Sequence, residues 1–469
     1  MVFSSLVFLF VFLPITLIAY YIFPNTSIRN TILLIASLIF YAWGEPVYIV
    51  LMVLTTLLDY FFGIALDKLG NRPNAKRAAL ITALIINLGI LGFFKYYGFI
   101  IRNINNIFNL SIKDPNLPLP VGISFYTFQA ISYLIDVYLG NAPVQKNLIA
   151  FSTYITMFPQ LVAGPIVQYE DIAKQLRNRK ESLDKFVDGI QWFIIGLAKK
   201  VLLANNIGAL WDIIKNSPVE QISVLSSWIG IVAFTFQIYF DFSGYSDMAI
   251  GLGKVFGFDF MKNFDYPYTS KSITEFWRRW HISLGSWFRE YVYIPLGGNR
   301  RGKLKWYRNI LIVWFLTGFW HGADWNFILW GLYFALFLIL EKGFLKQWLE
   351  EKPAFIGQLY TIVVVIVGWV LFEFQDIGQG ALFIKTMFGL GKNKLIDNAS
   401  IYYLQSYGLI FIILALASTP ILKKWARRLE EKLYTAKAII FPVLYFVLLF
   451  LSTAYLVNES YNPFLYFRF

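Results

Sequence analysis

Two histidines, His281 and His321, are the residues whose type and setting best suit chemistry in this 469-residue sequence, which contains no other histidine. Each follows a tryptophan and lies in aromatic sequence that can reach membrane depth. An ionisable group at that depth is costly and is by default a candidate functional residue. An imidazole titrates near neutral pH and is the commonest general base. Activation of a hydroxyl nucleophile is therefore the first chemistry to consider for either ring, and a structural hydrogen bond between helices is the alternative.

The surroundings of His321 favour a catalytic role over a structural one. Gly322 opens space beside the ring, and Gly318 lies about one helical turn earlier. Trp320 and Asp324 are the neighbours expected to line a site with it. We therefore predict that His321 is the catalytic residue.

For His281 the catalytic and structural interpretations stay equally open. Arg278 and Arg279 precede it by three and two residues. Guanidinium groups suit phosphate geometry, so these arginines are candidates to orient a phosphate-bearing donor such as a coenzyme. Trp277 opens the same motif and is a candidate wall of the donor site.

A third polar segment, Gln237–Asp247, ends a long apolar stretch. Its candidate binding or tunnel-lining residues are Tyr239, Asp241 and Ser243. The carboxylates of Asp241 and Asp247 need partners at membrane depth, and we expect these to be the two arginines or a histidine. A structural ion pair between helices is as well supported here as a direct catalytic role.

Composition excludes several classes of protein. The chain is 58% hydrophobic and only 15% charged, whereas soluble domains carry roughly 25% charged residues. Because it has no cysteine, thiol catalysis and cysteine-ligated metals are excluded. No metal-ligand cluster and no nucleic-acid motif is visible, and we attribute the net charge of +13 to short cytoplasmic loops. These basic loops are Lys68–Arg77, Lys174–Lys185, Arg300–Arg308 and Lys423–Lys432.

The elements that must position these residues are apolar runs about long enough to span a bilayer, which takes about 20 residues. We expect an all-α polytopic membrane protein with about ten to twelve transmembrane helices, folded as a single membrane domain over residues 1–469. The first run lacks a basic leader and a small-residue cleavage site, so we interpret it as a retained span rather than a signal peptide. The clearest runs are Ser5–Phe23, Thr31–Ala42, Tyr48–Leu66, Ala79–Phe94, Phe355–Phe374, Tyr407–Leu422 and Ile439–Val457.

Two segments are predicted to enter the membrane without crossing it. Three apolar segments lie between the basic residues Arg77 and Lys174, and the positive-inside rule allows only two of them to cross. Ile149–Val167 is the best candidate to stay on one side, because Phe158–Pro165 contains two prolines and a glycine. Such broken backbone is expected to be buried or to line a cavity, and a kinked span is the alternative. Lys262–Gly298 is interpreted as a re-entrant or interfacial element.

Five strings of sequence carry a resemblance to a known family: Pro120–Gln129, Phe158–Pro165, Tyr239–Asp247, Trp277–Leu284 continuing to Tyr293–Arg300, and Gly318–Trp325. Through them, nearly the whole chain resembles the membrane-bound O-acyltransferases, and within these the bacterial alginate O-acetyltransferase (AlgI) branch. The last two strings are highly specific when they occur together, whereas a Trp-His-Gly sequence alone is a weak signal.

The resemblance implies a fold, an activity and partners. His321 matches the family's catalytic histidine, and His281 matches the upstream histidine that supports the active site. Both would lie in a central tunnel through which a cytoplasmic donor, acetyl-CoA in this branch, meets an outer acceptor. No bound cofactor is implied. The implied partners are membrane lipid and an extracytoplasmic protein with a serine-hydrolase-like fold, which passes acetyl to an exopolysaccharide. The implied location is the inner (cytoplasmic) membrane, with multiple passes.

Four alternatives stay open at this point. The acceptor hydroxyl can attack the acyl group directly, or an acyl-histidine can form first. The cargo can be D-alanine destined for teichoic acid, as in the related DltB branch. From other classes, two histidines can hold a haem, or broken helices and polar residues near the midplane can mark a transporter or flippase of polymer precursors. Absence of a visible inverted repeat disfavours the transporter.

Overall fold

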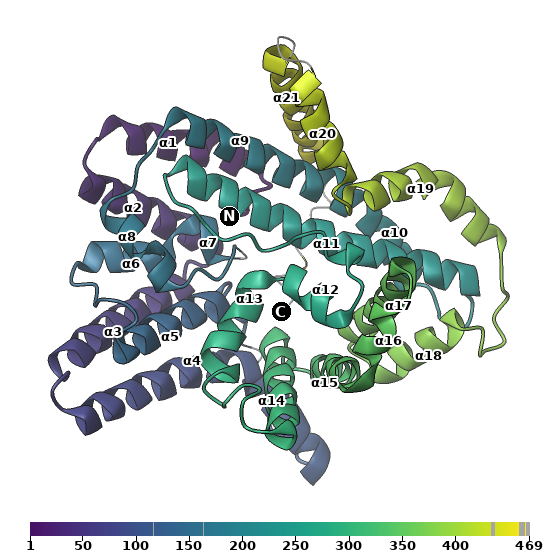
Figure 1. Ribbon diagram of the computed structural model, residues 1–469, viewed down its shortest axis with the longest axis horizontal. Helices are drawn as coiled ribbons and strands as arrows, with labels where there is room; N and C mark the ends of the chain where they lie inside the picture. The colour runs from purple at the N-terminus through teal and green to yellow at the C-terminus, as the bar shows by residue number, and fades with distance from the viewer. Residues whose placement is uncertain (116, 163, 433–436, 459–464, 466–469) are drawn as a thin grey trace. The chain divides into compact units, whose positions relative to one another are not determined.

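The computed structural model describes residues 1–115, 117–162, 164–432, 437–458 and 465, and the regular elements within these ranges are all helices (Figure 1). Nine of the described helices are long and apolar enough to cross a membrane, and a shorter apolar stretch precedes them. The prediction of an all-α polytopic membrane protein is therefore confirmed. The nine helices are Thr26–Gly44, Tyr48–Lys68, Pro73–Phe108, Leu183–Lys215, Val224–Val255, Trp325–Glu350, Ala354–Glu373, Asn398–Ala417 and Ala438–Asn458, and the shorter stretch is Phe8–Ile22.

One compact unit comprises residues 1–193 and 246–261. Within it α3, α4 and α5 pack against one another, and α2 packs on α6 (Figure 1). Asparagine side chains cap two of its helices, because Asn25 accepts from the first turn of α2 and Asn147 from the first turn of α6. Its helices are η1 (Phe8–Phe12), α1 (Leu13–Ile22), α2 (Thr26–Gly44), α3 (Tyr48–Lys68), α4 (Pro73–Phe108), α5 (Ile123–Leu139), α6 (Leu148–Thr156), α7 (Phe158–Leu161), α8 (Tyr169–Arg177) and most of α9 (Leu183–Ala198).

The second compact unit comprises residues 194–245 and 262–469, and α11 continues from it into the first unit. The expectation of a single membrane domain over residues 1–469 remains a prediction. The elements of this unit are η2 (Lys199–Asn205), α10 (Asn206–Lys215), α11 (Val224–Val255), η3 (Pro267–Thr269), α12 (Ile273–Arg279), α13 (Ile282–Phe288), η4 (Arg289–Tyr293), α14 (Lys303–His321), α15 (Trp325–Leu340), η5 (Glu341–Leu345), α16 (Lys346–Glu350), α17 (Ala354–Glu373), α18 (Ile377–Met387), α19 (Asn398–Ala417), α20 (Ile421–Lys432) and α21 (Lys437–Asn458).

The predicted break in Ile149–Val167 is present. Helix α6 ends at Thr156, and Met157 has extended backbone angles (φ −53°, ψ 115°) before the four-residue α7. A nine-residue helix is about 14 Å long, which is too short to cross a hydrocarbon core of about 30 Å. All four residues of α7 are buried. This burial satisfies the rule that broken backbone at membrane depth is packed in protein.

One predicted span was wrong in position. The sequence pattern placed it at Tyr407–Leu422, whereas α19 runs from Asn398 to Ala417. The helix begins early because Asp397 and Ser400 form a reciprocal capping box. It ends early because Pro420 lies three residues beyond its last residue and has no backbone N–H to donate.

Two further differences bear on the site. The sequence analysis did not single out Leu183–Lys215 as a span, because Lys199 and Lys200 interrupt its apolar pattern. In the predicted re-entrant segment Lys262–Gly298, the helices α12, α13 and η4 have seven, seven and five residues. None of these short helices can span a bilayer, as expected.

Candidate active site

A tight helical hairpin, α14 followed by α15, positions His321. His321 is the last residue of α14, Gly322 is extended, and the Asp324 side chain accepts from the Trp325 N–H at 2.8 Å to cap α15. Near the turn the two backbones touch. A Cβ at Gly318 would collide with the Phe327 carbonyl, and a Cβ at Gly331 would collide with the Trp314 carbonyl. Small residues therefore set the separation of the helices and fix the backbone that carries His321.

Aromatic rings surround the His321 imidazole, which is 6% exposed. The ring centroids of Trp330, Trp320 and Phe372 lie 4.9, 5.1 and 5.5 Å from that of His321, with interplanar angles of 86°, 77° and 81°. These are edge-to-face contacts, which hold a ring in a defined orientation. The imidazole is thus held in a largely apolar, dry setting, where electrostatic interactions are stronger than in water.

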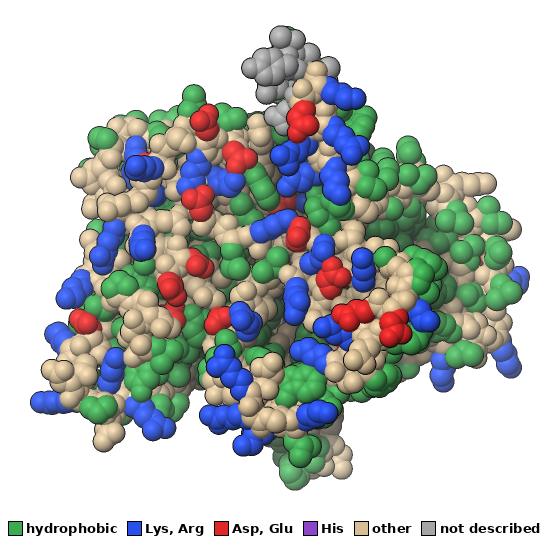
Figure 2. Space-filling model, in the orientation of Figure 1, with side chains coloured by type: hydrophobic (Ala, Val, Ile, Leu, Met, Phe, Trp, Pro, Cys, Tyr) green, Lys and Arg blue, Asp and Glu red, His purple; other side chains and the backbone are tan. Residues whose placement is uncertain are grey.

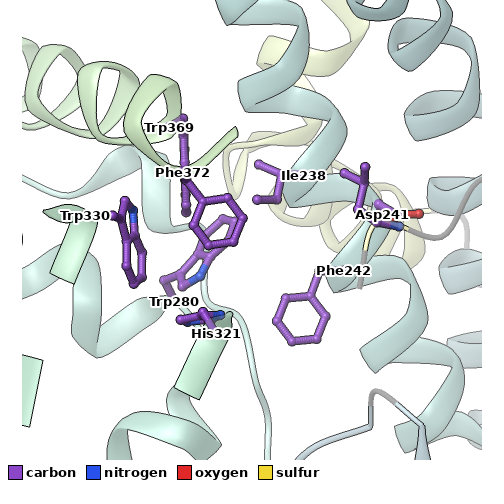
Figure 3. Close-up of a pocket in the computed structure, with 9 residues that line it drawn as sticks. Ile238, Asp241, Phe242, Trp280, His321, Trp330, Trp369 and Phe372 are labelled. Atoms are coloured by element: carbon purple, nitrogen blue, oxygen red, sulfur yellow. The ribbon is translucent and has the colours of Figure 1, made fainter. Parts of the chain in front are cut away.

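A pocket of about 370 Å³, its open side included, lies beside His321 (Figure 3). Among the described residues, Asp241 and His321 are the ionisable side chains that line the pocket, and the rest of its wall is apolar or aromatic. Its lining residues are Ile238, Asp241, Phe242, Trp280, His321, Trp330, Trp369, Phe372 and Leu465.

The second histidine is held by an amide. His281 lies between α12 and α13 with φ 47°, a left-handed conformation that is uncommon outside glycine. Its Nδ1 lies 3.3 Å from Asn263 Oδ1, which also accepts from Ser283 N–H at 3.1 Å and from the Ser283 hydroxyl at 3.0 Å. Because the backbone N–H can only donate, this atom of Asn263 must be the oxygen, and His281 Nδ1 carries a proton. In the neutral ring with Nδ1 protonated, Nε2 is the basic nitrogen.

The structure brings the two histidines close without joining them directly. The Trp320 ring centroid lies 6.2 Å from that of His281 and 5.1 Å from that of His321. Phe242 contacts His281 at 4.7 Å between ring centroids and also lines the pocket. His281 itself is not among the pocket-lining residues. The supporting role that the family resemblance implies for His281 stays a prediction.

Asp241 is paired, but not with the partner that we expected. The sequence analysis assigned it to Arg278, Arg279 or a histidine, whereas its Oδ1 lies 2.7 Å from Lys200 Nζ, with both side chains 2% exposed. Arg279 instead pairs with Glu275 at 2.7 Å, one turn earlier on α12. The sequence analysis missed Lys200, although a lysine inside the apolar stretch before Asn206 was the available signal.

Another buried carboxylate positions α12, the helix that leads to Trp280. Glu341 is 2% exposed. Its Oε2 accepts from Thr274 N–H at 2.9 Å and from the Thr274 hydroxyl at 2.7 Å, and its Oε1 accepts from Ile273 N–H at 2.5 Å. A carboxylate at a helix N-terminus is favoured by the helix dipole and by charge-assisted hydrogen bonds. Trp280 then packs on Trp369 of α17, with 4.9 Å between centroids.

The remaining sequence-predicted residues do not line the pocket. Trp277 packs in the hairpin against Trp314 and Phe334 at 4.7 and 4.9 Å between centroids. Tyr239 and Ser243 are buried on α11, whereas Arg278 is exposed on α12. Asp247 belongs to the first compact unit.

Five aromatic residues of the pocket wall were not candidate site residues in the sequence analysis: Phe242, Trp280, Trp330, Trp369 and Phe372. Trp330, Trp369 and Phe372 lie in sequence that is mainly aromatic and apolar. Only tertiary packing distinguishes them from residues that face lipid or the protein core, so residue type gave no signal.

A pocket with a buried histidine at a Trp-His-Gly turn, within a polytopic helical fold, defines a class of membrane enzyme. Residues 142–377 match the family model of the membrane-bound O-acyltransferases (MBOAT). The chain belongs to this family and is an O-acyltransferase.

Individual relatives match all or part of the chain. It is 38% identical over 500 residues to the "Probable alginate O-acetylase AlgI" of Pseudomonas putida, covering 100% of both proteins. It is 35% identical over 425 residues to the "Peptidoglycan O-acetyltransferase" of Helicobacter pylori, covering 83% of this chain and 80% of that protein. Similarity to the "Teichoic acid D-alanyltransferase" of Bacillus subtilis is lower, 29% over 275 residues and 56% of this chain.

Proposed function

We propose that this protein transfers an acetyl group from cytoplasmic acetyl-CoA, through the membrane, to an extracytoplasmic hydroxyl acceptor. The transfer serves O-acetylation of a cell-surface or secreted polysaccharide, with alginate the first candidate. Full-length similarity to proteins named as alginate O-acetylases supports the acetyl cargo over D-alanine, because the D-alanyltransferase match covers only 56% of the chain. Membership in an acyltransferase family favours this reaction over polymer transport or haem binding.

In this proposal His321 is the general base, and the observation that carries it is that His321 lines an otherwise mainly apolar pocket. The other ionisable lining group, Asp241, is held by Lys200 at 2.7 Å. The acceptor O–H gives its proton to the imidazole, and its oxygen bonds to the thioester carbonyl carbon. The C–S bond then breaks, and the proton passes to the departing thiolate. Such base catalysis contributes roughly 10²–10⁴-fold to the rate. In the alternative route an imidazole nitrogen attacks the thioester, an acyl-histidine forms as the thiolate leaves, and the acceptor oxygen then displaces the imidazole.

Trp330 is the candidate donor to the reacting carbonyl. It lines the pocket and is 1% exposed. Its indole N–H is buried and has no acceptor among the described residues. A buried donor without an acceptor is costly, and an acyl oxygen in the pocket would supply one. Since negative charge develops on that oxygen during attack, such a hydrogen bond would stabilise the transition state more than the ground state.

The proposal extends to location and partners. Arg278 is exposed at the end of α12 and suits contact with the phosphates of a coenzyme. We place the protein in the inner membrane. Its acceptor is an extracytoplasmic partner protein with a serine-hydrolase-like fold. In this account the partner receives the acetyl group and passes it to the polymer.

The donor assignment can be tested with purified protein in liposomes. One sample receives radiolabelled acetyl-CoA and the other a D-alanyl carrier protein, each with a polysaccharide acceptor and the extracytoplasmic partner. Label transfer from acetyl-CoA with release of free thiol is the expected result. If only the D-alanyl carrier served as donor, the transferred group would be D-alanine and the acetyl assignment would be wrong. Movement of a solute without a covalent product would favour a transporter.

A further inference from the structure

Leu465, far from the rest of the site in sequence, forms part of the pocket wall. It is 5% exposed and lines the pocket with His321 and Trp330. Its backbone N–H donates to Asp241 Oδ2 at 3.0 Å, across a separation of 224 residues. Leu465 is therefore attached to α11 beside the pocket.

The Asp241 carboxylate divides its two oxygens between two partners. Oδ1 faces Lys200 Nζ at 2.7 Å, and Oδ2 accepts the Leu465 N–H. Lys200 is itself fixed, because its Nζ also donates to Asn205 Oδ1 at 2.8 Å. A hydrogen bond to an ionised carboxylate is shorter and stronger than a neutral one. The buried lysine thus places a positive charge beside the carboxylate that the Leu465 amide contacts.

A gain in folding stability alone does not explain why the chain has a buried Lys200–Asp241 ion pair. Replacing a buried ion pair with apolar side chains of similar volume is often neutral or stabilising, because desolvation offsets the attraction between the charges. A specific contact that apolar residues cannot make is a better reason. Here that contact is the backbone hydrogen bond to Leu465, which places an apolar side chain in the pocket beside His321.

We propose that Lys200 and Asp241 form a positioning pair that holds Leu465 in the wall of the acyl-transfer pocket. The pair does not exchange protons with substrate. It acts through Leu465, whose side chain completes the apolar surface against which a small acyl group packs. This role rests on the proposed function for its catalytic consequence, but the contact itself can be measured without any substrate.

The test uses two double variants that both remove the charges. Lys200→Met with Asp241→Asn keeps a side-chain oxygen that can accept the Leu465 N–H. Lys200→Met with Asp241→Leu keeps no acceptor. Removing both charges together avoids an uncompensated buried ion, so both proteins should fold and insert. Yield and thermal stability in detergent verify this.

The readout is the accessibility of position 465. Since the chain has no cysteine, Leu465→Cys introduces a single thiol and leaves the backbone N–H in place. Labelling by a water-soluble maleimide should be slow in the parent and in the Asn variant, and at least about tenfold faster in the Leu variant. Acetyl transfer, measured without the added cysteine, should be at least about tenfold slower in the Leu variant than in the Asn variant.

The two readouts separate the two proposals. Equal labelling rates in the two double variants would overturn the anchoring role, whatever the activity. Faster labelling in the Leu variant, with equal acetyl transfer in both variants, would support the hydrogen bond as the anchor of Leu465. It would contradict the proposed effect of that anchor on acyl transfer. If the parent transfers no acetyl group, the proposed function fails while the labelling comparison still decides the anchor.

Discussion

The Asn263 amide oxygen fixes the second histidine, since three donors from His281 and Ser283 converge on it. Asn263→Leu should lower the rate of acetyl transfer about 10–100-fold, a range measured for residues that orient a functional histidine. Ser283→Ala is the matched control, because it removes one donor and leaves the acceptor for His281. Initial rates at saturating acetyl-CoA measure both variants. Equal rates in the two variants would contradict a positioning role for Asn263.

The substitution Trp330→Phe tests whether the Trp330 indole N–H donates a hydrogen bond to the reacting carbonyl. Phenylalanine keeps an aromatic ring beside His321 but removes the indole N–H. We expect kcat to fall by roughly 10²-fold, the lower end of the effect of losing one oxyanion donor, with little change in KM. The control is Trp314→Phe, which removes an indole N–H from the same aromatic cluster outside the pocket. A drop in kcat of equal size in the control would assign the effect to packing.

At the scale of elements, the α14–α15 hairpin determines where His321 lies. Gly318→Ala places a methyl group against the Phe327 carbonyl. The helices must then separate, and overpacking of this kind costs about 1–3 kcal/mol. We expect a lower midpoint of thermal unfolding in detergent and a fall in acetyl transfer that persists well below that temperature. Gly408→Ala on α19 is the control, because no atom of the described residues lies within 4 Å of the place that an added methyl group would take. Full activity in Gly318→Ala would show that the hairpin spacing does not govern the site.

Sequence patterns predicted the long helices well where hydropathy alone determines them. Phe355–Phe374 was expected, and α17 is Ala354–Glu373, because the thickness of the bilayer sets the length of such a run. The pattern was wrong for α19, whose ends depend on the local chemistry of Asp397, Ser400 and Pro420 rather than on hydropathy.

The site could be predicted only in part, for a related reason. His321 and Asp241 were identified because an ionisable residue in apolar sequence is unusual. The pairing of Asp241 with Lys200, and its contact with Leu465, depend on tertiary packing between distant segments. No spacing in the sequence encodes these contacts.

At the scale of the whole molecule, the direction of transfer depends on topology. Lys and Arg side chains gather over α20 and over the loop before α14 (Figure 2). The positive-inside rule places such loops in the cytoplasm. A single cysteine at Lys424, in the native cysteine-free chain, should therefore react with an impermeant maleimide in inside-out vesicles and not in intact spheroplasts. Labelling in spheroplasts would place α20 outside and reverse the proposed direction.

The most direct test of the account is the acetyl-transfer rate of His321→Ala, measured in liposomes with radiolabelled acetyl-CoA and compared with the parent protein. The account predicts a fall of roughly 10²–10⁴-fold, the contribution of a general base, while the yield of inserted protein and its thermal stability match the parent. A folded His321→Ala protein that transfers acetyl at the parental rate would contradict the central claim, because no other imidazole lines the described pocket.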